Sequence, residues 1–222
     1  MTPDTTPNAT AETETRWSVH YDVEQIRVRD PAAEALAVLE PGDPFVVGYA
    51  DVVKAAGHSC PTAAGAYRLA QVGLETLYPD ELPVRSEIEV LAAGPRDDPS
   101  YGVTGRIISY ITGAAGPDGF AGLAGGHGGR RGLLTFDAFE TDAVGPTVRF
   151  RRTDTGAAVE VTYHVGDVPA AGPGVEHLDA LVAGTASAKE RGAFRAAWHD
   201  RVRTVLADDD LFSVSTVDGE DG

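Results

Sequence analysis

The stretch GHSCPTAAGAYRLAQVGLETLYP, residues 57–79, decides the fold. Apolar residues recur along it at helical spacing, so we expect a helix over about 60–77 with one apolar stripe facing a core. Pro61 suits the first turn of that helix, where a missing N–H costs nothing, and Pro79 lies just beyond its end. Gly57 lies between this helix and an earlier apolar segment, and a glycine there lets the backbone turn between the two.

Two further helical segments are expected before this stretch. PAAEALAVL, residues 31–39, follows Asp30, which suits a helix cap, and it stops at Pro41-Gly42. Residues 46–56 also carry apolar side chains at helical spacing.

After Pro83, apolar residues recur at every second position and no longer at the helical spacing of about 3.6 residues. This alternation is typical of strands. Five segments have this pattern: 84–93, 103–112, 131–140, 147–154 and 157–165. The pattern returns to helix at 174–184 and 187–207. We therefore predict an α+β domain, with a mostly antiparallel sheet of about five strands flanked by helices at both termini.

The domain is expected to span 17–207, with 174–207 as its C-terminal helices. Residues 1–16 are polar and acidic, which predicts a disordered tail, and 208–222 are expected to be a frayed acidic tail. The N-terminus lacks the features of a signal peptide and no stretch is long and apolar enough to span a bilayer, so we expect a cytoplasmic protein that is not in the membrane.

The charge balance is strongly acidic, with 34 acidic and 18 basic residues and a formal net charge of −16. Lys54 and Lys189 are the only lysines. This composition resembles that of a halophilic proteome, and the alternative is an acidic surface for a basic partner. No basic stripe is evident along the sequence, so nucleic-acid binding is not expected.

The most specific local feature is Gly57-His58-Ser59-Cys60-Pro61 at the expected helix start. A helix N-terminus favours thiolate over thiol, and thiolate and imidazole together suit zinc, iron or a haem iron. Two ligands do not close a four-coordinate site, so we expect a third, and His127 in the glycine-rich segment is the first candidate. Weaker candidates are His164, His177 and His199.

The glycine-rich segment 113–132 has a second expected role. Its glycines from Gly113 onward, followed by Arg130 and Arg131, suit an anion cradle or the carboxylates of a haem. A flexible surface loop or a lid over the His58–Cys60 site are the alternatives. We expect Tyr67 either to line a cavity at the His58–Cys60 site or to lie in the core.

Two stretches carry a resemblance to a known family. GYADVVKAAGHSCPTAAGAYRLAQVGLETLYP (48–79) and SYITGAAGPDGFAGLAGGHGGRRGLL (109–134) are similar to the formylmethanofuran dehydrogenase E-subunit-like family. Its G-H-x-C-P helix start matches residues 57–61, its later T-G-rich segment matches from Thr112 and Gly113 to Leu134, and the resemblance covers about 45–165.

The resemblance implies an α+β fold, a homodimer, and a metal or tetrapyrrole site at the helix start, with association with a larger enzyme complex. The chain departs from the family at Ala114, where other members carry a cysteine. We therefore expect a metal- or haem-binding redox accessory protein. The alternatives are an enzyme with Cys60 as nucleophile and His58 as base, and a non-catalytic dimeric adaptor.

Overall fold

A computed structural model describes residues 14–217 and contains six α-helices and seven strands within that range. The helices are α1 (Pro31–Ala35), α2 (Tyr49–Ala56), α3 (Pro61–Leu77), α4 (Pro99–Thr112), α5 (Leu178–Val182) and α6 (Ala188–Ala207). The strands are β1 (Ile26–Val28), β2 (Phe45–Val47), β3 (Ile88–Ala92), β4 (Leu134–Thr135), β5 (Thr147–Arg152), β6 (Ala158–Tyr163) and β7 (Phe212–Val217).

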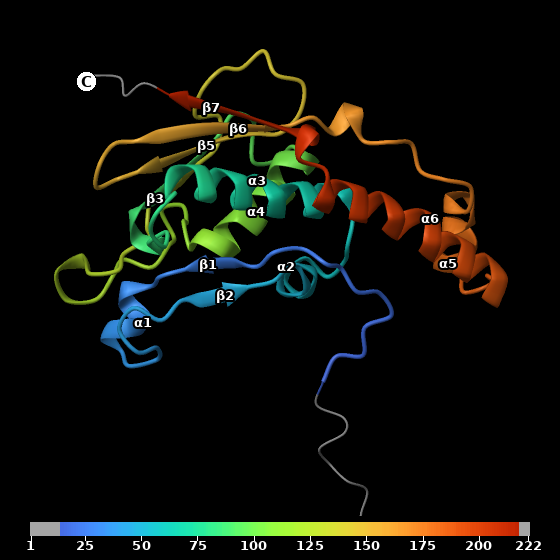
Figure 1. Cartoon of the computed structure of the whole chain (residues 1–222), viewed down its shortest axis with the longest axis horizontal. Helices are drawn as coiled ribbons and strands as arrows, with labels where there is room; N and C mark the ends of the chain where they lie inside the picture. Colours follow the sequence, from blue (N-terminus) through green and yellow to red (C-terminus); the bar gives the residue numbers. More distant parts are fainter. Residues whose placement is uncertain (1–13, 218–222) are drawn as a thin grey trace, which may run out of the picture.

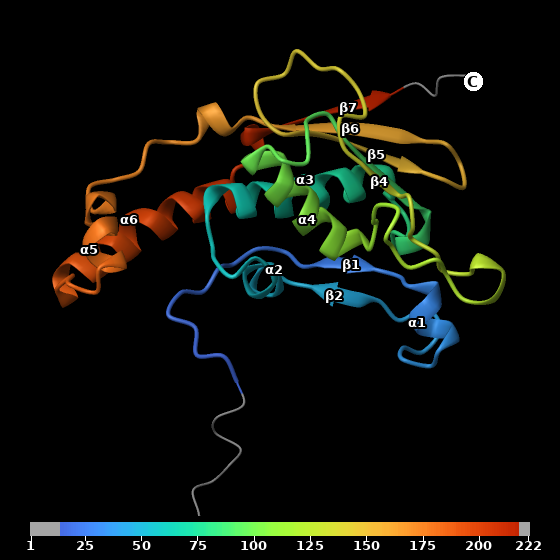
Figure 2. The same ribbon diagram turned by 180° about the vertical axis from the view of Figure 1, so that it is seen from behind.

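The elements form three layers, which Figures 1 and 2 show from opposite sides. A five-stranded sheet in the order β4-β3-β5-β6-β7 lies on one side of α3 and α4. The antiparallel pair β1–β2 lies on the other side, together with α1 and α2. Helices α5 and α6 lie at one end of the molecule, and α6 contacts α3.

Helix α3 occupies the middle of the core, because 13 of its 17 residues are buried. It contacts β5 and β6 on its sheet side and α2, α4 and α6 around the rest of its surface. Glycines allow the close approach to the sheet. A Cβ atom at Gly65 would lie 2.3 Å from Cε1 of Tyr163, and one at Gly73 would lie 2.5 Å from Cδ2 of Phe150.

The predicted α+β class is confirmed, but the sheet is mixed and not mostly antiparallel. Strand β4 runs parallel to β3, while β3–β5, β5–β6 and β6–β7 are antiparallel. The parallel pair arises because the chain crosses from β3 to β4 through α4 and the glycine-rich loop.

The expected strand at 103–112 is wrong, since these residues belong to α4. Asp98 caps this helix by accepting hydrogen bonds from the amides of Ser100 and Tyr101, and Pro99 lies in its first turn. Its buried isoleucines at 107, 108 and 111 have helical spacing. Their β-branched side chains favour strands only weakly, and the cap and the apolar spacing override that preference.

The two ends of the chain also differ from the prediction. Residues 212–217 form β7 at the edge of the sheet, so the expected frayed tail is corrected for this part, and 218–222 lie outside the described residues. Of the expected disordered tail, 14–16 form no helix or strand and 1–13 lie outside the described residues. The expected helix at 46–56 is split into β2 and α2.

The remaining elements are predicted correctly in type but are shorter than expected. The helix expected at 31–39 ends at Ala35, and only Leu178–Val182 of 174–184 is α-helical. The strand expected at 131–140 is reduced to two residues, Leu134–Thr135.

The close contact of α3 with the sheet can be tested with two glycine substitutions. We expect Gly65→Ala to lower the free energy of unfolding by about 1–3 kcal/mol, because the new methyl group overlaps the ring of Tyr163. Urea unfolding followed by circular dichroism measures this change. Gly192→Ala in α6 is the matched control: nothing lies within 4 Å of its Cβ position, so it should stabilise the fold by up to about 1 kcal/mol. Equal effects of the two substitutions would contradict this packing.

Candidate functional site

The loop between α2 and α3 holds the predicted motif. Gly57 ends α2 in the left-handed conformation, with φ 75°, and its amide donates to the carbonyl of Val53. The exposed His58 follows, and its Nδ1 lies 3.0 Å from the carbonyl oxygen of Ala56. Because a carbonyl only accepts, Nδ1 carries a proton in this hydrogen bond, and Nε2 is the ring nitrogen that this bond does not use.

Cys60 starts α3 and turns toward the helix. It is the N-cap residue, and its Sγ accepts a hydrogen bond from the amide of Ala63 at 3.3 Å. The half-buried thiol packs against the hydrophobic core. Cys60 therefore contributes to the helix cap and to packing.

Ser59, between them, joins three distant parts of the chain. Its Oγ lies 2.8 Å from the hydroxyl of Tyr21 and 3.0 Å from that of Tyr49. The indole N–H of Trp198 in α6 donates to its carbonyl oxygen at 2.8 Å. The hydroxyl of Tyr21 is in turn hydrogen-bonded to Nδ1 of His199. We call these five residues the Ser59 network; it fixes the loop to the N-terminal segment, to α2 and to α6.

His127 lies elsewhere in the structure. It is exposed on the glycine-rich loop, and its Nε2 is 3.2 Å from the carbonyl oxygen of Pro31 at the start of α1. Gly128 next to it packs closely on Ala32 of the same helix. His127 is thus held at α1, while His58 follows α2, and the structure does not bring the two imidazoles to one place. Within residues 14–217, no group of three or more His, Cys, Asp or Glu side chains could hold a metal ion.

The expected anion cradle is filled by a carboxylate of the protein itself. Asp30, only 3% exposed, caps α1 with Oδ1 and receives Nη1 of Arg130 at 3.0 Å and Nη1 of Arg85 at 3.3 Å on Oδ2. Gly113 makes room for this cluster, because a Cβ there would lie 2.6 Å from Cδ of Arg130. Arg130 therefore holds α1 against the glycine-rich loop.

The other predicted cofactor-binding residues are also placed structurally. Tyr67 is buried, and its hydroxyl donates to the carbonyls of Glu24 and Val47, while burial raises its pKa to about 12. Thr112 is buried and donates to the carbonyl of Ile108. Arg131 is exposed on the loop, where its Nε donates to the carbonyl of Gly119 at 3.4 Å.

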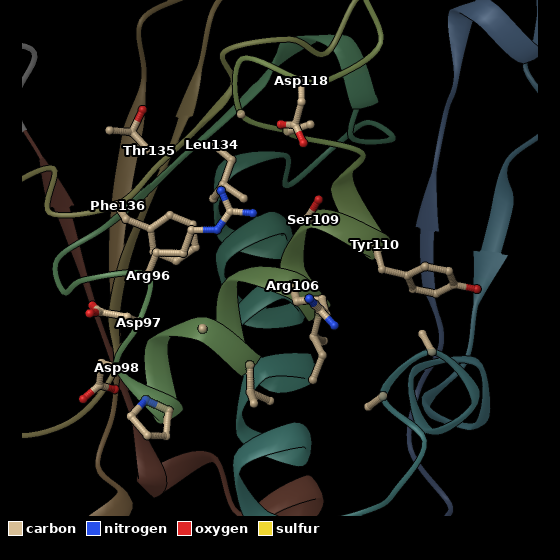
Figure 3. Close-up of a pocket in the computed structure, with 18 of the residues that line it drawn as sticks. Arg96, Asp97, Asp98, Arg106, Ser109, Tyr110, Asp118, Leu134, Thr135 and Phe136 are labelled. Carbon is tan, nitrogen blue, oxygen red and sulfur yellow. The ribbon is translucent and has the colours of Figure 1, made fainter.

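A cleft of about 960 Å³ opens beside His58, between α2 and α4. Its walls are the end of α2, the loop before α4, one face of α4, residues 115–118 and the segment around β4. We call it the α2–α4 cleft (Figure 3). His58 lines it, but Cys60, His127 and Arg130 do not. Its apolar surface comes from Val52, Ala55, Ala56, Val103, Ile107, Pro117, Leu134 and Phe136.

The charged side chains of the cleft are arranged along its length. Figure 3 shows Asp97 and Asp98 at one end and Asp118 at the other, with Arg96 and Arg106 between them. Within the described part of the chain, neither arginine forms an ion pair. The guanidinium of Arg96 lies 6.0 Å from the ring centre of Phe136. The middle of the cleft therefore offers two free cations beside an apolar wall.

The sequence prediction missed most of this cleft. Arg106, Ser109 and Tyr110 line it from one face of α4, and they were assigned to a strand. The signal that could have found them is the Asp98-Pro99 cap, which starts a helix. Tyr21 and Trp198 have no local signal, because they meet Ser59 only through the tertiary fold.

Searches of the sequence against protein-family models and against curated proteins found no match. The resemblance to the formylmethanofuran dehydrogenase E-subunit-like family therefore stays a prediction. No helix among residues 14–217 is both long and apolar enough to cross a membrane.

The Ser59 network predicts a pH dependence of stability. Burial, then Arg203 and Arg195, lower the pKa of His199 below 6.5, so the unfolded chain binds this proton more tightly than the folded chain. The free energy of unfolding should therefore fall as the pH drops below about 6.5. His199→Gln, which retains a hydrogen-bonding side chain at this position, should make thermal melting less dependent on pH between about 5 and 6.5. A variant with the same dependence as the parent would contradict this role of His199.

Proposed function

We propose that this chain binds an amphipathic organic anion in the α2–α4 cleft and acts as a cofactor-binding accessory protein. One observation carries the proposal: the cleft combines an apolar wall with two arginines that no acidic side chain of the described residues neutralises. Ligand sites are usually concave, mostly apolar, and supplied with a few polar groups that fix orientation. Their volumes run from about 300 to 1,000 Å³, and this cleft lies within that range.

The chemistry of the lining favours a carboxylate-bearing ligand. A guanidinium binds a carboxylate through two parallel N–H···O bonds. Arg96 and Arg106 lie in the middle of the cleft, so a ligand with its acidic groups there would place its apolar part against Phe136, Leu134 and Ile107. The aspartates at both ends would disfavour a ligand whose negative charge extends along the whole cleft.

Haem is the ligand of this class that the sequence predicted, and the lining residues fit it. Histidines that ligate metals usually donate their other ring N–H to a backbone carbonyl or a carboxylate, which fixes the ring. His58 has this arrangement through Ala56, so Nε2 is the atom that would hold the iron. Arg96 and Arg106 would hold the carboxylates. A bound haem would supply electron-transfer or small-ligand chemistry that the side chains of the chain lack.

A four-coordinate zinc or iron site with His58, Cys60 and His127 is not supported by the residues present. Cys60 points to the amide of Ala63, and His127 is bound at α1. We therefore derive no chemistry through such a metal. The alternative of a Cys60 nucleophile with His58 as its base is also weakened, because each side chain is hydrogen-bonded to a backbone group and not to the other.

Titration with haemin, followed by absorption spectroscopy, tests the proposal. We expect a saturable shift of the Soret band, and His58→Ala should lose the shift and weaken binding by about 10-fold or more. Arg106→Gln should weaken binding by about 10-fold through loss of a charge-assisted hydrogen bond. The matched control is His127→Ala, which changes an exposed histidine outside the cleft and should bind like the parent.

Titration with metal-free protoporphyrin separates iron ligation by His58 from carboxylate binding by Arg106. It should bind the parent and His58→Ala equally, because it has no iron for the imidazole, and it should still require Arg106. If neither porphyrin binds, the proposed ligand class is wrong. If His127→Ala loses haemin as His58→Ala does, the cleft is the wrong site.

A further inference from the structure

Helix α6 carries a row of basic side chains at four-residue spacing. Arg191, Arg195, His199 and Arg203 recur at i, i+4, i+8 and i+12, which places them on one face of the helix. The three arginines are exposed, and Arg203 and Arg195 are close enough to His199 to lower its pKa. At 1.5 Å per residue the row extends over about 18 Å. We call the three arginines the α6 basic row; His199 is half-buried between them and is hydrogen-bonded to Tyr21.

The basic row contrasts with the rest of the chain. Helix α6 contains five of the 18 basic residues but only two of the 34 acidic residues. Positively charged residues four positions apart repel one another and destabilise a helix. The fold therefore maintains an unfavourable concentration of positive charge on one helix of a strongly acidic protein.

No acidic side chain of residues 14–217 neutralises the row. Seven arginines elsewhere in the fold form ion pairs with aspartate or glutamate, whereas no arginine of α6 does. The row thus keeps its charge free, although acids outnumber bases almost twofold in the chain.

The position of α6 leaves the row accessible. Its C-terminal end packs on α3, while its N-terminal half lies with α5 at the end of the molecule that is farthest from β3 and α1 (Figures 1 and 2). Gly192 and Ala196 are exposed beside Arg191 and Arg195, and nothing lies within 4 Å of the Cβ position of Gly192. A second helix could approach α6 around Arg191 and Arg195 without displacing another side chain of the domain.

We propose that the α6 basic row is a docking surface for an acidic helix of a partner protein. An acidic helix with carboxylates four residues apart would match the spacing of the row. Charge complementarity of this kind fixes partner choice and register. The proposal is independent of the ligand proposed for the α2–α4 cleft.

A nucleic acid fits the same row less well. Its phosphates form a continuous polyanion that would extend beyond about 18 Å onto a body rich in unneutralised acids. A short acidic helix can end where the row ends. The acidic residues outside α6 therefore repel a long polyanion, whereas α6 still attracts a short one.

A peptide-binding experiment tests this surface. The probe is a fluorescent helical peptide of about 16 residues, long enough to span the row, with glutamate at every fourth position and alanine between. We expect saturable binding to the full chain by fluorescence anisotropy, at the lowest salt that keeps it folded, and weaker binding as salt increases. Arg191→Glu combined with Arg195→Glu should weaken binding by about 10-fold or more, because like charges then face the peptide.

The matched control is Arg16→Glu combined with Arg27→Glu, which makes the same charge change at exposed residues outside α6 and should bind like the parent. Arg191→Gln with Arg195→Gln repeats the test without charge reversal, and thermal melting verifies that each variant is folded. The proposal is overturned if the peptide with glutamine in place of glutamate binds equally well. It is also overturned if oligothymidylate binds more tightly than the acidic peptide, or if the arginines are needed only for self-association in size-exclusion chromatography.

Discussion

The contact between α3 and the five-stranded sheet is the constraint on which the rest of the fold depends. Gly65 and Gly73 let the helix backbone approach the rings of Tyr163 and Phe150. A helix that lies this close to the sheet can be covered on its other sides by α2, α4 and α6. Its position then sets the start of α3, and with it the loop that carries His58, Ser59 and Cys60.

That loop has two sides with different contacts. The Ser59 network ties it to the N-terminal segment and to α6. On the other side, His58 lines the α2–α4 cleft with a ring that is already fixed by the carbonyl of Ala56. The proposed site for an organic anion and the proposed docking surface on α6 would together suit an accessory protein. In both, arginines without acidic partners provide the charge.

The sequence predicted most elements whose signals are local, with the exception of α4, which was expected to be a strand. Helix α3 and the hairpin of β5 and β6 were expected, because apolar period, proline position and turn residues act within a few residues. Strands β1 and β7 were missed, since they are stabilised by pairing with distant partners. At the candidate site, the motif at 57–61 indicated an imidazole and a thiol, but not where these two side chains point. Arg130 meets Asp30 one hundred positions away, and only the fold brings them together.

Backbone NMR of the full chain during titration with metal-free protoporphyrin is the most direct test of the proposed ligand site. The account predicts that amide shifts concentrate in 52–58, 96–110 and 115–118, which surround the α2–α4 cleft. The amides of β7, which lie outside this cleft, should remain unchanged. Shifts centred on β7 or on the core-facing residues of α3, with none at 96–110, would contradict the assignment of the site.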